Sequence, residues 1–206
     1  MIIVASVLGG CADTGPERPA PLVAGSGAPV IIPGGPGEPG RTARPGENLG
    51  ETEARVTAAD VRFAEGMIPH HRQALEMAAL VPSRSSSPVL RRLAGRITAA
   101  QRPEIAAMTS WLRAAGRTPG EHDGSGGHGG HTLPLEEMNR LRAARGAAFD
   151  TLFLTLMITH HEAAVTMAGL QLREGSDRAM LATAKDVVSG QGIEIARMRD
   201  LLRPGA

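Results

Sequence analysis

Two histidine doublets are the residues of this chain best suited to chemistry, and each follows a methionine at the same spacing. The sequence "MIPHH" runs from Met67 to His71, and "MITHH" runs from Met157 to His161. Imidazole nitrogen and thioether sulfur together form a soft to borderline ligand set, which favours Cu(I), or silver as its chemical mimic, over iron or magnesium. The doublets are therefore candidate metal ligands.

The doublets belong to a longer internal repeat with one constant offset. The first half carries Asp60, Phe63, Met67, Ile68, His70, His71, Ala74, Met77, Ala78 and Leu80, and the second carries Asp150, Phe153, Met157, Ile158, His160, His161, Ala164, Met167, Ala168 and Leu170. The same offset relates Gln101, Glu104, Ile105, Ala106, Met108 and Leu112 to Gln191, Glu194, Ile195, Ala196, Met198 and Leu202. This repeat predicts two similar helical hairpins packed about a pseudo-two-fold axis as an all-α four-helix bundle.

Helical spacing places the repeated residues on one inward-facing stripe, about 120° wide. The four histidines and their flanking methionines then form a symmetric set of candidate metal ligands: His70, His71, His160, His161, Met67, Met157, Met77 and Met167. The second helix of each hairpin adds auxiliary candidates on its own inward face: Met108, Met198, Glu104 and Glu194.

Two other roles for the histidines stay open. Di-iron and di-manganese bundles use Glu-x-x-His, whereas here a methionine precedes each first histidine, and Glu104 and Glu194 supply few acidic ligands for such an oxidase. Alternatively, the histidines could form structural networks with carboxylates such as Asp60 and Asp150, in a helical interaction module without metal.

The elements that must position these residues are four helices, predicted over residues 56–81, 88–115, 135–172 and 176–202. Pro88 suits the opening turn of the second helix, Gly175 suits the end of the third, and Ser176 suits the N-cap of the fourth. We expect a domain over residues 52–206, with hairpins at 52–116 and 135–206. The Gly-rich loop between them, residues 117–134, holds His122, His128 and His131, as a solvated linker or an auxiliary tract that captures Cu(II) or zinc.

The amino-terminal segment reads as an export signal and a tether. Residues 1–10 followed by Cys11 resemble a bacterial lipoprotein signal, in which the cysteine carries the lipid. Residues 11–51 are rich in Pro and Gly, which predicts a disordered linker. We therefore expect a lipid-anchored protein of the bacterial cell envelope, with its domain in the periplasm or on the extracellular face.

Composition narrows the function classes. The chain has no Tyr, one Trp and three Phe, so its core must consist mainly of aliphatic residues and Met. The formal net charge is +1, and the arginines are scattered rather than clustered. These features predict no nucleic-acid partner.

The pattern Asp-x-x-Phe-x-x-x-Met-Ile-x-His-His-x-x-Ala-x-x-Met-Ala, followed by Gln-x-x-Glu-Ile-x-x-Met, occurs in both halves. It resembles the bacterial family catalogued as domain of unknown function 305 (DUF305), from about residue 52 to the carboxyl terminus. The resemblance implies a ferritin-like four-helix bundle. The family includes periplasmic copper-binding proteins, so the resemblance also implies copper binding through the Met and His positions named above.

The resulting expectation is an envelope protein that binds copper without catalytic turnover. We expect Cu(I) as the favoured ion, with Cu(II) and Ag(I) as further ions, and a role in metal tolerance, buffering or delivery. A copper-transfer protein or a second copy of this chain is the expected partner, and the membrane is contacted through the lipid anchor alone.

Overall fold

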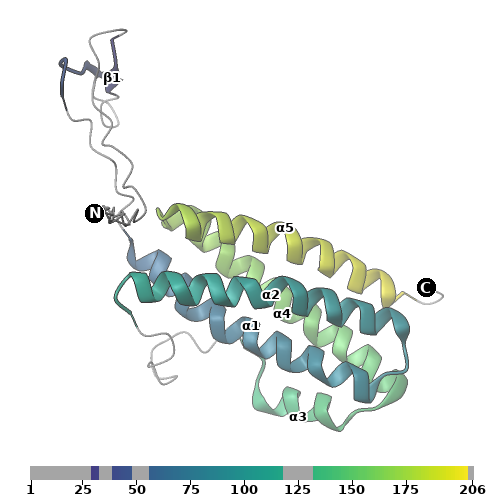
Figure 1. Ribbon diagram of the computed structural model, residues 1–206. Helices are drawn as coiled ribbons and strands as arrows, with labels where there is room; N and C mark the ends of the chain where they lie inside the picture. Colours follow the sequence, from purple (N-terminus) through teal and green to yellow (C-terminus); the bar gives the residue numbers. More distant parts are fainter. Residues whose placement is uncertain (1–28, 33–38, 48–55, 118–131, 204–206) are drawn as a thin grey trace, which may run out of the picture. The chain divides into compact units, whose positions relative to one another are not determined.

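The computed structural model describes residues 29–32, 39–47, 56–117 and 132–203 (Figure 1). The chain divides into two compact units, Met1–Glu53 and Ala54–Ala206, and each is described by itself. Cys11, His122, His128 and His131 lie outside the described residues, so the lipid anchor and the auxiliary loop ligands stay predictions.

Five helices make up the described part of the second unit. They are α1 (Ala58–Arg84), α2 (Pro88–Ala114), α3 (Leu135–Ala143), α4 (Gly146–Glu174) and α5 (Arg178–Leu201). The four long helices form two hairpins, α1 with α2 and α4 with α5, and α1 packs against α4 (Figure 1). The predicted all-α bundle of two hairpins is confirmed. Among the described residues, no helix has both the length and the apolar character required to cross a membrane.

Helices α1 and α4 run antiparallel, as their side-chain contacts show. Near the start of α1, Arg62 pairs with Glu174 at the end of α4. Further along α1, His70 contacts His160, which lies at the middle of α4. The contacts along α1 thus meet progressively earlier positions of α4, as expected for a two-fold axis that runs across the two helices.

Local capping sets where the helices begin. Thr57 and Asp60 form a reciprocal capping box at the start of α1. Ser87 caps α2 directly before Pro88, as the sequence predicts for a proline in the opening turn. The predicted N-cap Ser176 is wrong, because Asp177 caps α5 by accepting from the backbone N–H groups of Ala179 and Met180.

The long third helix expected over residues 135–172 is also wrong, because the chain breaks between α3 and α4. Arg145 is extended, with φ −144° and ψ 155°. Gly146 follows with φ +58°, a left-handed conformation that glycine adopts without steric cost. The break lets α3 pack separately, with Met138 and Leu141 buried in the core. Arg142 of α3 also pairs with Glu76 of α1.

The buried apolar residues form two clusters. The Met67 cluster consists of Val61, Phe63, Ala64, Met67, Ile68, Met108, Leu112, Ala164, Met167, Ala168, Met180, Ala184 and Val187. The Met77 cluster consists of Ala74, Met77, Ala78, Val81, Leu90, Leu93, Ala94, Ile97, Met138, Leu141, Phe149, Phe153, Leu154, Leu156, Met157, Ile195 and Met198. Both are built largely from aliphatic and methionine side chains, as composition predicts.

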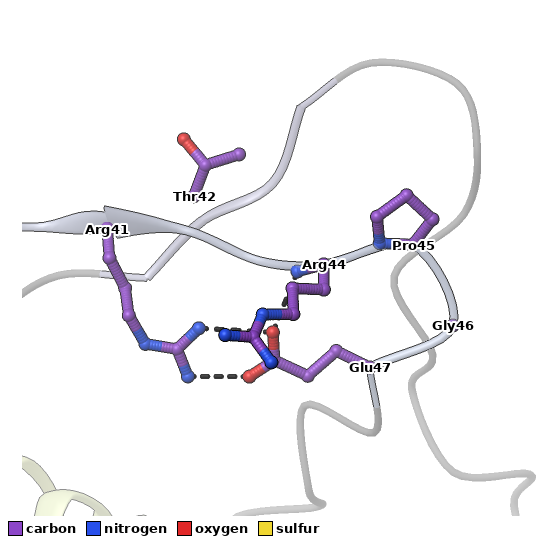
Figure 2. Close-up of a pocket in the computed structure, with 6 residues that line it drawn as sticks. All are labelled: Arg41, Thr42, Arg44, Pro45, Gly46 and Glu47. Atoms are coloured by element: carbon purple, nitrogen blue, oxygen red, sulfur yellow. Dashed lines mark hydrogen bonds and ion pairs between the residues drawn. The ribbon is translucent and has the colours of Figure 1, made fainter.

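In the first unit, the described residues form a small antiparallel pairing of β1 (Ile31–Ile32) with β2 (Arg41–Thr42). Glu47 accepts two hydrogen bonds from the Arg41 guanidinium and one from the backbone N–H of Arg44 (Figure 2). The Arg41 hydrogen bond holds the pKa of Glu47 at about 2, below its ordinary range. Gly46, at φ +78°, makes the turn. The described residues of this segment thus form a local turn and strand pair, while the disordered linker over residues 11–51 stays a prediction.

Candidate metal centre

The first histidine of each doublet meets its counterpart across the interface between α1 and α4. The ring centroids of His70 and His160 lie 3.7 Å apart, with their planes inclined by 32°. Both side chains are buried, at 0% and 1% exposure. Since these residues occupy equivalent positions of the repeat, this contact lies at the pseudo-two-fold axis of the bundle.

The second histidine of each doublet turns toward the other helix of its own hairpin. His71 Nε2 lies 2.6 Å from Glu104 Oε2, and His161 Nε2 lies 2.8 Å from Glu194 Oε2. Each histidine ring lies more than 6 Å from its doublet neighbour, centroid to centroid. The structure therefore brings each auxiliary glutamate to a candidate histidine, and it does so twice with nearly the same geometry.

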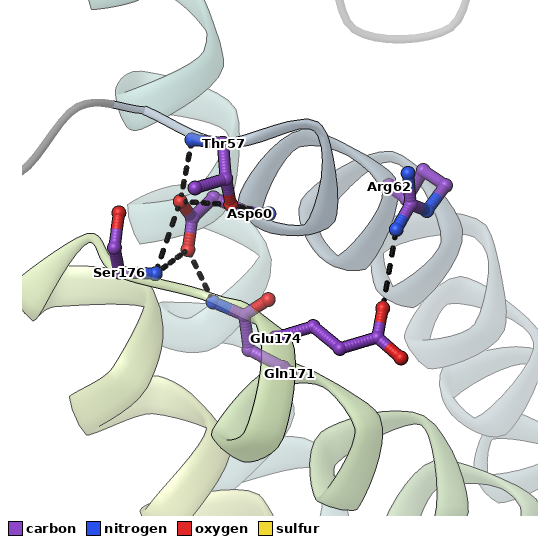
Figure 3. Close-up of polar contacts among 6 residues, drawn as sticks. All are labelled: Thr57, Asp60, Arg62, Gln171, Glu174 and Ser176. Carbon is purple, nitrogen blue, oxygen red and sulfur yellow. Dashed lines mark hydrogen bonds and ion pairs between the residues drawn. The ribbon is translucent and has the colours of Figure 1, made fainter. Parts of the chain in front are cut away.

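Asp60 and Asp150, the carboxylates considered as structural partners of the histidines, are used differently. Asp60 accepts from Thr57, from Gln171 Nε2 at 2.5 Å, and from the backbone N–H of Ser176 (Figure 3). It also accepts from the backbone N–H of Asp177. Burial by itself raises the pKa of Asp60, but the hydrogen bonds outweigh it and hold the pKa below its ordinary value. Glu104 and Glu194 are the histidine partners instead.

Three candidate methionines lie in each apolar cluster. The Met67 cluster holds Met67, Met108 and Met167, and the Met77 cluster holds Met77, Met157 and Met198. The sequence repeat relates each methionine of one triad to a methionine of the other: Met67 matches Met157, Met77 matches Met167, and Met108 matches Met198. All six are buried, with exposures from 0% to 7%. The antiparallel packing of α1 and α4 is what mixes methionines of both hairpins within each triad.

Burial governs the electrostatics of the histidine layer. Desolvation lowers the pKa of His160 well below its ordinary value, and the positive charge of His70, His161 or His71 lowers it further. Within the described part of the chain, Nδ1 of His71, Nδ1 of His161 and both ring nitrogens of His160 have no hydrogen-bond partner. Neutral, unpaired imidazole nitrogens are the form that binds a metal ion.

Two buried amides were missed as site candidates from the sequence. Gln101 and Gln191 occupy equivalent positions of the repeat, three residues before Glu104 and Glu194. Both are buried, and neither amide oxygen nor nitrogen has a partner among the described residues. Their recurrence on the inward helix face was the signal that could have identified them.

The donor set fits a soft cation better than a hard one. In the described ranges, no group of three or more His, Cys, Asp or Glu side chains lies close enough to hold a metal ion. Each hairpin instead offers unpaired imidazole nitrogen, and the two apolar clusters hold buried thioethers. Imidazole and thioether ligands favour Cu(I) over iron, manganese or magnesium.

Comparison with known proteins places the chain in a family. Residues 60–202 match the family model described as "Domain of unknown function (DUF305)". No curated protein matches this chain. A DUF305 fragment from Deinococcus radiodurans is 32% identical, with a TM-score of 0.65, covering 71% of this chain and 97% of the other.

Two further solved structures are similar over most of the domain. A DUF305 protein from Streptomyces coelicolor is 30% identical, with a TM-score of 0.65, covering 70% of this chain and 91% of the other. CopM in its Cu(I)-bound form is 29% identical, with a TM-score of 0.61, covering 69% of this chain and 94% of the other. CopM has also been solved in Cu(II)-bound and Ag-bound forms. On the match over residues 60–202, this chain belongs to the DUF305 family.

Proposed function

We propose that this chain is a copper-binding protein of the bacterial cell envelope, held at the membrane by lipid on Cys11. It binds Cu(I) in preference to Cu(II), with Ag(I) as a mimic, and serves metal tolerance, buffering or delivery without catalytic turnover. The observation that carries the proposal is the buried contact between His70 and His160, one from each repeat, in a bundle whose two apolar clusters each hold three of the candidate methionines. The Cu-bound and Ag-bound forms of CopM support the same ion class.

The proposed ligands are the four histidines His70, His71, His160 and His161, with Met67, Met157, Met77 and Met167. Met108 and Met198 join them as further thioethers, since each lies in the same cluster as two of the others. His122, His128 and His131 remain proposed auxiliary ligands for ion capture. Burial of the histidine layer excludes water, which suits a soft cation that gains little from hydration.

The envelope location rests on the sequence before Cys11 and on one relative. The Streptomyces coelicolor protein is described as a candidate secreted protein. A protein that handles copper outside the cytoplasm would exchange the ion with another copper-binding protein or with a second copy of this chain. Globomycin treatment of cells that express the chain, followed by mass spectrometry of the mature amino terminus, tests lipidation of Cys11.

The binding test is a Cu(I) titration of the full chain against a competing chelator, which removes ions from weak sites. The His70, His71, His160 and His161 quadruple alanine variant should lose high-affinity binding. Because four buried alanines could prevent folding, circular dichroism accompanies the titration, and a Met67→Leu, Met108→Leu, Met167→Leu variant removes thioethers at nearly constant volume. This second variant should bind Cu(I) at least about tenfold more weakly.

Met138 and Met180 provide matched controls. Each is buried in one of the two clusters but has no methionine counterpart in the other half of the repeat. Met138→Leu and Met180→Leu should leave Cu(I) affinity unchanged. Equal affinity in the triple variant and in these controls would remove Met67, Met108 and Met167 from the site.

A di-metal oxidase is the second candidate, and the two His–Glu pairs are the observation that favours it. Such an enzyme would carry iron or manganese as isolated, with its two metal ions about 3.5–4 Å apart. Metal analysis of protein purified from cells grown with copper, iron and manganese separates the two candidate functions. Copper alone in the purified protein would remove the oxidase, whereas stoichiometric iron or manganese would remove the copper carrier.

A further inference from the structure

The two His–Glu hydrogen bonds are the most faithfully repeated polar feature of the bundle. His71 and His161 are each 0% exposed, while the side chains of Glu104 and Glu194 are 22% and 11% exposed. Each carboxylate therefore reaches the edge of the bundle and stays partly hydrated, while the imidazole is enclosed.

The position of the proton follows from the chemistry of the two groups. A carboxylate oxygen is a hydrogen-bond acceptor, so the 2.6 Å and 2.8 Å contacts assign the hydrogen to Nε2 of each ring. In a neutral imidazole, the other nitrogen then has a free lone pair. That nitrogen is Nδ1, and in both rings it is buried and has no hydrogen-bond partner among the described residues.

A buried acceptor with an unused lone pair is costly unless something occupies it. Glu104 and Glu194 thus leave the two Nδ1 atoms available as electron-pair donors in the bundle interior. His160 provides an internal contrast, because its ring has no carboxylate partner within the described part of the chain. Its tautomer is therefore not set in the same way.

We propose that Glu104 and Glu194 are positioning residues, not metal ligands: each holds its histidine as the Nε2–H tautomer and so assigns Nδ1 as the metal-binding atom. The inference rests on the proposed function, because it concerns the same soft-cation site. A hydrogen bond from a ligating histidine to a carboxylate fixes the orientation of the ring and raises the basicity of the ligating nitrogen. The bonds repeat in both hairpins, so each half supplies one such nitrogen.

The test is long-range 1H–15N correlation NMR of the imidazoles in the full chain, labelled with 15N-histidine, with and without Ag(I). In the metal-free protein, His71 and His161 should show the Nε2–H pattern. Added Ag(I) should shift their Nδ1 resonances and leave Nε2 protonated. Ag(I) is diamagnetic, so the signals remain visible.

Variants at the two glutamates separate positioning from ligation. Glu104→Ala and Glu194→Ala, each made alone, should give a mixture of tautomers at the affected ring and weaken Ag(I) binding by about 10–100-fold without changing the stoichiometry. Glu104→Gln and Glu194→Gln keep an acceptor oxygen, so they should retain the tautomer and most of the affinity. Glu162→Ala, which removes an exposed partner of Arg199 beside His161, is the matched control and should change neither quantity.

Each outcome decides between the inference and the proposed function. Ag(I) bound through Nε2, an unchanged tautomer in the alanine variants, or a lower Ag(I) stoichiometry in them would overturn the positioning role while leaving a copper protein. If no histidine signal responds to Ag(I), both proposals fail. If an alanine variant does not fold, the glutamine variant and the metal-free tautomer still decide.

Discussion

The two hairpins share the repeated His, Glu and Asp positions. The contacts of the second histidine of each doublet are nearly the same in both hairpins, whereas the contacts of the aspartate in the opening turn differ. At the centre, His71–Glu104 and His161–Glu194 have nearly equal distances. At the opening turns, Asp60 is buried and accepts from the turn between α4 and α5, whereas Asp150 is half-buried and its Oδ1 has no partner in the described ranges. A repeated residue therefore keeps its role only where the surroundings repeat as well.

The cause of the difference lies in the residues that surround the two aspartates. The repeat places Ala147 where the first hairpin has Thr57, so the second opening turn has no capping hydroxyl. It also places Val81 at the position of Gln171, so no side-chain amide is available to Asp150. The pairing of Asp60 with the far hairpin belongs to one copy alone.

Replacing each aspartate alone should give the largest difference in unfolding free energy between the two copies of the repeat. Asp60→Ala removes the carboxylate that accepts from the part-buried backbone N–H groups of Ser176 and Asp177 and from the buried Gln171 amide, so unfolding free energy should fall by about 3 kcal/mol or more. Asp150→Ala should change it by less than about 1 kcal/mol. Urea denaturation followed by circular dichroism measures both, and equal losses would contradict the asymmetry.

Gly175 offers a second contrast, in the turn that Asp60 closes. A Cβ added there would lie 2.1 Å from Gln171 Nε2 and 2.7 Å from Asp60 Oδ1, although its φ of −81° is ordinary. Gly175→Ala should therefore destabilise the domain by about 2 kcal/mol through overpacking. Gly190→Ala is the control, because a Cβ on that α5 residue meets nothing within 4 Å. It should raise the thermal midpoint by improving helix propensity.

Lowering the pH should reduce the stability of the domain in two separate pH ranges, one set by His160 and the other by Asp60. The pKa of folded His160 is lowered, so below pH about 6.5 the unfolded chain binds a proton that the folded chain does not, and stability falls as pH decreases. The slope contributed by this group approaches about 1.4 kcal/mol per pH unit. The pKa of folded Asp60 is also lowered, so its stabilising contribution is lost only as pH falls below about 4. Urea denaturation from pH 7.5 to 3 measures both windows, and His160→Gln should flatten the upper one.

The smallest expected effect comes from making the first opening turn resemble the second. Thr57→Ala removes the hydroxyl that accepts from the Asp60 backbone N–H and donates to its carboxylate, while Asp60 keeps its contacts with the far hairpin. The loss of this N-cap should lower unfolding free energy by about 1 kcal/mol. Thr151→Ala, on the exposed face of α4, is the control and should change the thermal midpoint little. A loss as large as that of Asp60→Ala would mean that the cap and not the far hairpin holds Asp60.

Much of the histidine centre could be predicted from the sequence because helical periodicity decides which residues share a face. His70 and His71 differ by about 100° around the helix axis, so one doublet must direct its two rings at different neighbours. Periodicity also placed Glu104 and Glu194 on the inward faces. It could not say that these glutamates, rather than Asp60 and Asp150, would meet the histidines, because that depends on the axial level of one helix against the next.

The sequence by itself determined the repeat, the hairpins and the set of inward-facing His, Met and Glu side chains, since these follow from local spacing. Only the tertiary structure decided that His70 meets His160, that His71 and His161 turn to their glutamates, and that the methionines divide into two mixed triads. It also decided the break at Gly146 and the cap at Asp177. Each of these outcomes depends on contacts between segments far apart in the chain, and such contacts have no signature in local periodicity.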